Sequence, residues 1–153
     1  MLNPKDRYWV LVADSGQARL LELRRKPYTF QQLSEVVSDT RHLTSKELVS
    51  DASGRVYHTQ GPGTHGMQPR SDPHDFAEEQ FASGLAKKMN KAAGQGRFEH
   101  LVLIADARTL GRLRRDMGKA ASDRVFEERA LNLSNIPLQE LEPRIRDILG
   151  WAA

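Results

Sequence analysis

The sequence predicts a single α/β domain in which helices pack on a mixed β-sheet. Two observations lead to this fold class: three strand-like stretches open the chain, and its second half alternates helical with strand-like patterns. A length of 153 residues, 39% of them hydrophobic, suffices for one core. We therefore expect one domain over residues 1–153, with a three-strand meander followed by alternating helices and strands.

The three expected strands lie before residue 40. Residues 8–13 (YWVLVA) and 17–23 (QARLLEL) are β-favouring runs separated by the tripeptide DSG, which is typical of a β-hairpin. Residues 30–37 have apolar positions that fit either a strand or one face of a helix. We favour a third strand there.

A long glycine- and proline-rich loop follows at residues 50–72, where the apolar rhythm disappears. Loops of this length in a compact domain are usually functional or disordered. Glycines let backbone approach a ligand closely, and arginine and histidine side chains donate to phosphates. The candidate binding residues of this loop are Arg55, His58, Gln60, Gly61, Gly63, His65, Gly66, Gln68 and Arg70.

The loop leads into the helix with the clearest pattern in the chain. Asp72 is a good N-cap, Pro73 suits the first helical position, and acidic residues load the first turns. Phe81, Leu85 and Met89 recur every four residues and predict a buried stripe, with Phe76 beside it. The lysines near the negative end of this helix, before Gly94, are Lys87, Lys88 and Lys91.

The rest of the chain alternates strand and helix. Residues 100–105 (HLVLIA) form an unbroken apolar run, which is typical of a strand buried on both faces. Residues 107–117 and 137–149 carry helical patterns, and residues 125–133 are a candidate last strand. Right-handed crossover connections place the strand at 100–105 parallel to the strand at 8–13. This is the ribonuclease H-like arrangement.

Five basic side chains gather in and just after the helix at 107–117, mostly on its outward side. They are Arg108, Arg112, Arg114, Arg115 and Lys119. The formal net charge is +3 and the isoelectric point is near 9.4, so this basic helix is a candidate surface for a phosphate backbone. The competing interpretation is an ordinary solvated helix face, since Asp116 interrupts the cluster.

Two carboxylates, Asp14 and Asp106, each follow an apolar strand, and the expected sheet makes these strands neighbours. Paired carboxylates at strand ends could hold metal ions for phosphodiester cleavage. Each also suits an ordinary role, Asp14 in a turn and Asp106 as a helix cap. The histidines His58, His65 and His74 are not one helical turn apart, so we predict no metal site from them.

Composition excludes several other classes of protein. The absence of cysteine excludes disulfides, thiolate metal sites and a cysteine nucleophile. Neither a Walker A pattern, a dinucleotide fingerprint nor Gly-x-Ser-x-Gly occurs, so we expect no cofactor. The opening residues lack the apolar core of a signal peptide, and no apolar run is long enough to span a membrane. We therefore expect a cytoplasmic protein.

Three segments together resemble a known family: WVLVADSGQARLLEL, ELVSDASGRVYHTQGPGTHGMQPRSDPHDFAEEQFASGLAKKM and HLVLIADARTLGRLR. The sequence resembles the bacterial host-attachment proteins over nearly its whole length. That family in turn is similar to the middle domain of archaeal and eukaryotic peptide-chain release factors and of the ribosome-rescue factor Pelota. The resemblance implies a ribonuclease H-like sheet carrying a loop that can enter an RNA-lined space.

In release factors this loop bears Gly-Gly-Gln, whose glutamine helps to position water against peptidyl-tRNA. The tripeptide is absent here, where the loop has QGPG at 60–63 and GMQ at 66–68. We therefore expect a non-enzymatic module that contacts ribosomal or transfer RNA through residues 54–70 and the basic helix, and that affects attachment indirectly. The alternatives are a metal-dependent nuclease using Asp14 and Asp106, and a protein-interaction module in attachment or signalling.

Overall fold

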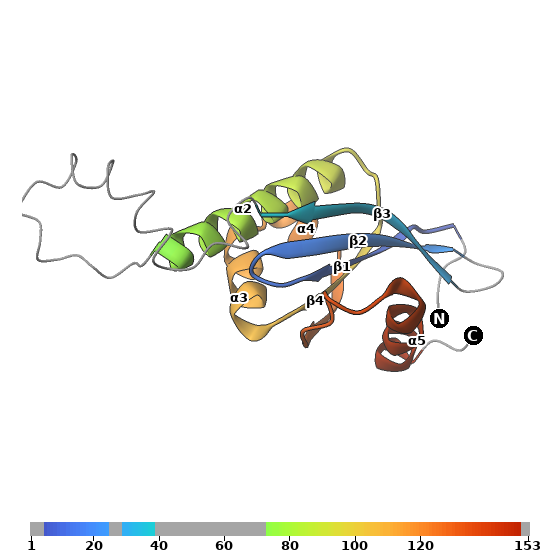
Figure 1. Ribbon diagram of the computed structural model, residues 1–153. Helices are drawn as coiled ribbons and strands as arrows, with labels where there is room; N and C mark the ends of the chain where they lie inside the picture. Colours follow the sequence, from blue (N-terminus) through green and yellow to red (C-terminus); the bar gives the residue numbers. More distant parts are fainter. Residues whose placement is uncertain (1–4, 25–28, 39–72, 151–153) are drawn as a thin grey trace, which may run out of the picture.

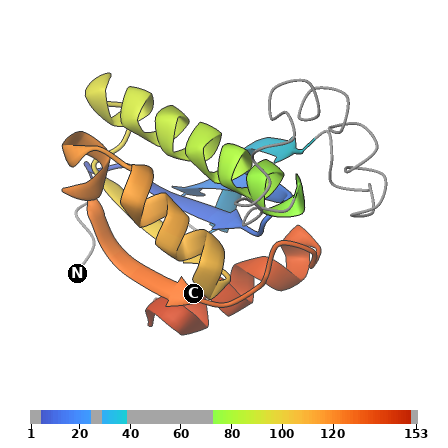
Figure 2. The same cartoon turned by 90° about the vertical axis from the view of Figure 1, so that its left-hand side faces the viewer.

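The computed structural model describes residues 5–24, 29–38 and 73–150. Within these residues the fold has three layers, with a β-sheet between helices (Figure 1). A view from the side shows two roughly parallel helices on one face and the C-terminal helix on the other (Figure 2). The predicted fold class, helices packed on a mixed sheet, is confirmed.

The sheet has five strands in the order β3-β2-β1-β4-β5. Their bounds are β1 Tyr8–Ala13, β2 Gln17–Arg24, β3 Thr29–Val37, β4 His100–Ala105 and β5 Val125–Ala130. The first three strands form the antiparallel meander, and β4 runs parallel to both β1 and β5. This is a ribonuclease H-like topology, and the predicted parallel pairing of the first and fourth strands is confirmed.

A bulge in β3 explains why its sequence also fitted a helix. Leu20 pairs with Ser34 and Leu21 pairs with Gln32, so Leu33 is an extra residue without a partner in β2. The extra residue interrupts the two-residue alternation of a strand and leaves apolar side chains at a spacing that resembles a helix. The last strand also differs from its prediction, because it ends at Ala130 rather than at Leu133.

Four helices complete the described structure: α2 Pro73–Gly94, α3 Ala107–Asp116, α4 Lys119–Ser122 and α5 Leu138–Leu149. Asp106 is the N-cap of α3, and its carboxylate accepts a hydrogen bond from the backbone N–H of Thr109. Gly150 ends α5 in the left-handed conformation, which glycine adopts without steric cost. The one-turn helix α4 was not predicted, because four residues are too short for a periodic pattern.

The sheet separates two hydrophobic cores. Trp9 and Leu11 of β1 face the core under α2 and α3, whereas Val10 and Val12 face the core under α5. Strand β4 is buried over residues 101–105 because both of its faces are covered. The alternation of side chains along a strand therefore supplies both cores from the same two central strands.

The predicted apolar stripe of α2 lies in the first core, with one exception. Leu85 and Met89 are buried, and Phe81 packs against the same core with part of its surface exposed. Phe76, in contrast, is 62% exposed, so the side chain expected beside the stripe lies outside the core. The core contacts of α2 therefore begin at Phe81 and Ala82, in its third turn.

Truncation of α5 tests the second core. We expect Ile145→Ala to lower the free energy of unfolding by about 2–5 kcal/mol, since its fully buried side chain leaves a cavity. Ile148→Ala removes the same atoms from a partly buried side chain of the same helix, so its loss should be smaller. Urea denaturation measures both, and equal losses would contradict the packing of α5 described above.

Candidate functional site

The two strand-end carboxylates lie at the same edge of the sheet. Ala13 pairs with Ala105 in the parallel register of β1 and β4, so Asp14 and Asp106 follow paired residues. The register therefore confirms that the two strands are parallel neighbours, whereas a shared role for the two carboxylates stays a prediction.

Both carboxylates, however, already have structural partners. Asp14 accepts hydrogen bonds from the backbone N–H groups of Gly16 and Gln17, each at 2.8 Å, and from the hydroxyl of Ser134 at 2.6 Å. Asp106 caps α3 through one oxygen. In the described parts of the chain, no group of three or more histidine or acidic side chains could hold a metal ion. The two carboxylates therefore have structural roles. Asp14 stabilises the β1–β2 turn and links it to Ser134, and Asp106 caps α3.

That link belongs to a buried polar contact between the β1–β2 hairpin and the segment before α5. The side-chain amide of Gln17 donates to the Ser134 carbonyl at 2.8 Å, and the Arg19 guanidinium donates to the carbonyls of Leu133 and Ile136. Burial lowers the pKa of Arg19 from its ordinary value. Sequence reasoning missed this contact, because its partners are more than a hundred residues apart.

The basic helix carries an acidic partner for each of its five cations. The pairs are Arg108–Asp75, Arg112–Asp75, Arg112–Glu78, Arg114–Glu128, Arg115–Asp116 and Lys119–Asp123. Arg112 does not point outward, since its side chain is only 10% exposed and bridges to α2. The neighbouring carboxylates raise the pKa values of Arg114 and Arg115. This surface is therefore largely neutralised from within the molecule.

A second set of cations has no acidic partner among the described residues. Lys87, Lys88 and Lys91 of α2, together with Arg97, are exposed, and none forms an ion pair with another described residue. We call these four residues the basic surface. Sequence reasoning attributed the lysines to the helix end alone. The sequence does contain the indication, since residues 80–98 include these four basic side chains and no acidic one.

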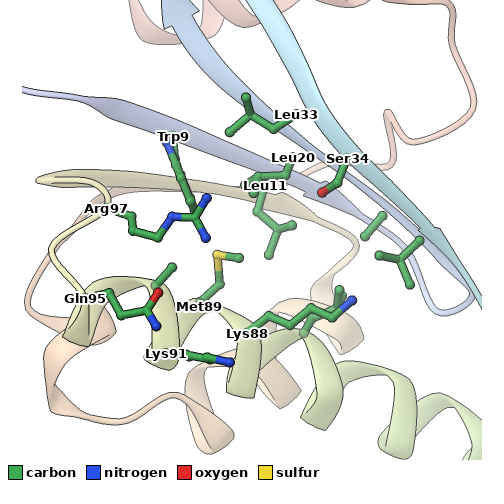
Figure 3. Close-up of a pocket in the computed structure, with 14 residues that line it drawn as sticks. Trp9, Leu11, Leu20, Leu33, Ser34, Lys88, Met89, Lys91, Gln95 and Arg97 are labelled. Carbon is green, nitrogen blue, oxygen red and sulfur yellow. The ribbon is translucent and has the colours of Figure 1, made fainter.

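Beside the basic surface, an apolar groove of about 340 Å³ lies between α2 and strands β1, β2 and β3 (Figure 3). Trp9 and Leu11 contribute to its floor, and the Arg97 guanidinium lies 5.7 Å from the centre of the Trp9 ring. Three of the four cations, Lys88, Lys91 and Arg97, line the groove. The structure thus brings together an apolar cavity and unpaired positive charge.

The loop residues predicted to bind RNA lie outside the described residues. This applies to Arg55, His58, Gln60, Gly61, Gly63, His65, Gly66, Gln68 and Arg70. Their role remains a prediction from the sequence. No helix in the described part of the chain has the length and apolar character needed to cross a membrane.

The strand order and the two helical layers define an α/β protein of ribonuclease H-like topology. The chain belongs to the family described as "Protein required for attachment to host cells", whose model matches residues 9–145. This confirms the resemblance seen in the sequence. No curated protein matches the sequence.

Two solved structures are similar to this chain at low sequence identity. The archaeal translation termination factor aRF1 has a TM-score of 0.48 and 5% identity over 97% of this chain. The Aquifex aeolicus Ppx/GppA phosphatase, type II variant, has a TM-score of 0.37 and 12% identity over 81% of this chain. The chain spans 40% of the first protein and 35% of the second.

The contacts of Asp14 lead to a stability prediction. We expect Asp14→Ala to lower the free energy of unfolding by about 1–3 kcal/mol, because two backbone N–H groups and the Ser134 hydroxyl lose their acceptor. Asp123→Ala is the matched control, since its ion pair with Lys119 is exposed and its loss should stay within about 0.5 kcal/mol. Equal urea midpoints for Asp14→Ala and the wild type would show that the link carries no stability.

Proposed function

We propose that this protein is a non-enzymatic module that binds RNA, and that the basic surface of α2 is its main contact with the phosphate backbone. The observation that carries this proposal is the contrast between the two sets of cations. Lys87, Lys88, Lys91 and Arg97 have no ion-pair partner among the described residues, whereas every cation of the basic helix has one.

Unpaired surface cations favour a polyanion for a physical reason. A lysine that neutralises a phosphate releases the counterions condensed on the nucleic acid, and this release drives binding at low salt. An arginine beside a carboxylate gains less, because the carboxylate already offsets its charge and repels the phosphate. The basic surface is therefore a stronger candidate than α3 for a polyanion contact.

The glycine-rich loop extends the same proposal. Its donors Arg55 and Arg70 precede α2 in the sequence, and the first lysine of the basic surface follows Pro73 by 14 residues. A helix rises 1.5 Å per residue, so Lys87 lies about 20 Å from the start of α2. A ligand that reaches both the start of α2 and Lys87 must be extended, which suits a strand or hairpin of ribosomal or transfer RNA.

The proposal assigns no catalytic step. Asp14 serves the turn and the link to Ser134, and one oxygen of Asp106 caps α3 while its Oδ1 has no hydrogen-bond partner among the described residues. No group of three or more histidine or acidic side chains in that part of the chain could hold a metal ion. The Gly-Gly-Gln tripeptide of release factors is absent from the sequence. We infer that an effect on attachment to host cells is indirect and follows from RNA binding in the cytoplasm.

A salt titration tests the proposal. We expect the wild type to bind a fluorescein-labelled ribosomal RNA hairpin with an affinity that falls steeply with NaCl concentration. Lys87→Gln/Lys91→Gln should reduce the slope of log K against log [NaCl] by about 1.5 and weaken binding roughly tenfold or more at 50 mM salt, because two phosphate contacts are lost. Fluorescence anisotropy measures both quantities.

The matched control removes the same charge from the paired set. Arg114→Gln/Lys119→Gln should bind the hairpin within about twofold of the wild type, because both cations already have acidic neighbours. The proposal fails if the wild type does not bind the hairpin at 50 mM salt. It also fails if Arg114→Gln/Lys119→Gln loses more affinity than Lys87→Gln/Lys91→Gln.

A further inference from the structure

The RNA-binding proposal uses the cations at the rim of the apolar groove, Lys88, Lys91 and Arg97, and leaves its apolar walls without a role. We propose that the groove is a binding site for a free medium-chain carboxylate, a small amphiphilic anion. The aliphatic tail lies in the groove, and the carboxylate lies against Lys88, Lys91 and Arg97.

The walls of the groove are suited to an aliphatic tail. Its volume of about 340 Å³ is at the lower end of the range of small-molecule sites, roughly 300–1,000 Å³. Its apolar lining includes Leu11, Leu20, Leu33, Leu85 and Met89. Figure 3 shows Leu11 and Met89 pointing toward each other from the sheet and from α2. The tail would therefore contact aliphatic side chains from both layers.

The bulge in β3 helps to form this wall. In a regular strand, Leu33 and Ser34 would point to opposite faces of the sheet. Leu33 is the extra residue of the bulge, and Leu33, Ser34 and Val36 all line the groove. Leu33 is 38% exposed, so an apolar side chain remains open to water at the groove. Bulges that redirect a side chain in this way are frequent beside functional sites.

The charge of the lining selects an anion. Among the described residues, the groove is lined by three cations and by no aspartate or glutamate. Ser34 and Gln95 supply the remaining polar side chains, which can donate hydrogen bonds. An amphiphilic anion satisfies both parts of the site. A nucleic acid backbone would use the cations and leave Leu33, which is 38% exposed, in contact with water.

Isothermal titration calorimetry with hexanoate, octanoate and decanoate below their micelle concentrations tests the proposal. We expect the dissociation constant to fall about fourfold for each added methylene until the groove is filled, because each methylene transfers to an apolar surface. Octylammonium has the same tail with the opposite charge and should bind at least tenfold more weakly than octanoate. Equal binding of the two ions would overturn the proposal, as would affinities independent of chain length.

Two variants locate the site on the protein. Ser34→Phe introduces a ring into the groove from an exposed position of β3, so octanoate should bind at least tenfold more weakly. Lys91→Gln removes one cation without filling space and should weaken octanoate about threefold or more. Lys119→Gln is the charge-matched control outside the groove and should bind octanoate within twofold of the wild type. Unchanged affinity in both groove variants would overturn the proposal.

Two further measurements separate this site from other occupants. Ser34→Phe should bind the RNA hairpin as the wild type does, because the basic surface is intact in it. Loss of RNA binding together with octanoate binding would show that the groove belongs to the RNA site instead. Binding to phosphatidylglycerol vesicles without any binding of free octanoate would identify a membrane surface as the occupant and overturn the proposal. Thermal unfolding of each variant verifies that it is folded.

Discussion

The burial of β1 and β4 on both faces is the constraint on which the rest of the structure depends. These parallel strands expose almost no surface, so each face of the sheet needs a cover that the chain must hold in place. Helices α2 and α3 cover one face. On the other face, α5 is positioned by the polar contact of Asp14, Gln17 and Arg19 with the segment before it. The carboxylate that resembled a catalytic group thus contributes to covering the sheet.

The same constraint determines which charges remain available. The first turns of α2 pack beside α3, and there Asp75 and Glu78 pair with arginines of that helix. The later part of α2 faces β1 and the meander, where its lysines have no acidic neighbour among the described residues. A helix with acids in its first half and bases in its second therefore neutralises one surface and leaves another positive. Its macrodipole favours the same distribution.

Most of the fold could be predicted from the sequence, because local patterns specify it. Strands 8–13 and 100–105 and the start of the helix at Pro73 follow directly from apolar runs and capping residues. The bulge in β3 could not be predicted, because it depends on the pairing register with β2. The inward orientation of Arg112 could not be predicted either, because it follows from an ion pair with Glu78, which lies 34 residues earlier in the chain. The basic surface was predictable from the acid-free stretch at 80–98, whereas the groove required the structure.

The most direct test of the central claim is a titration of ¹⁵N-labelled protein with the ribosomal RNA hairpin at 50 mM salt, followed by amide chemical shifts. The account predicts that, within the described residues, the largest shift changes cluster between residues 85 and 97. Changes that instead cluster on α3, where every cation has an acidic partner, would contradict it.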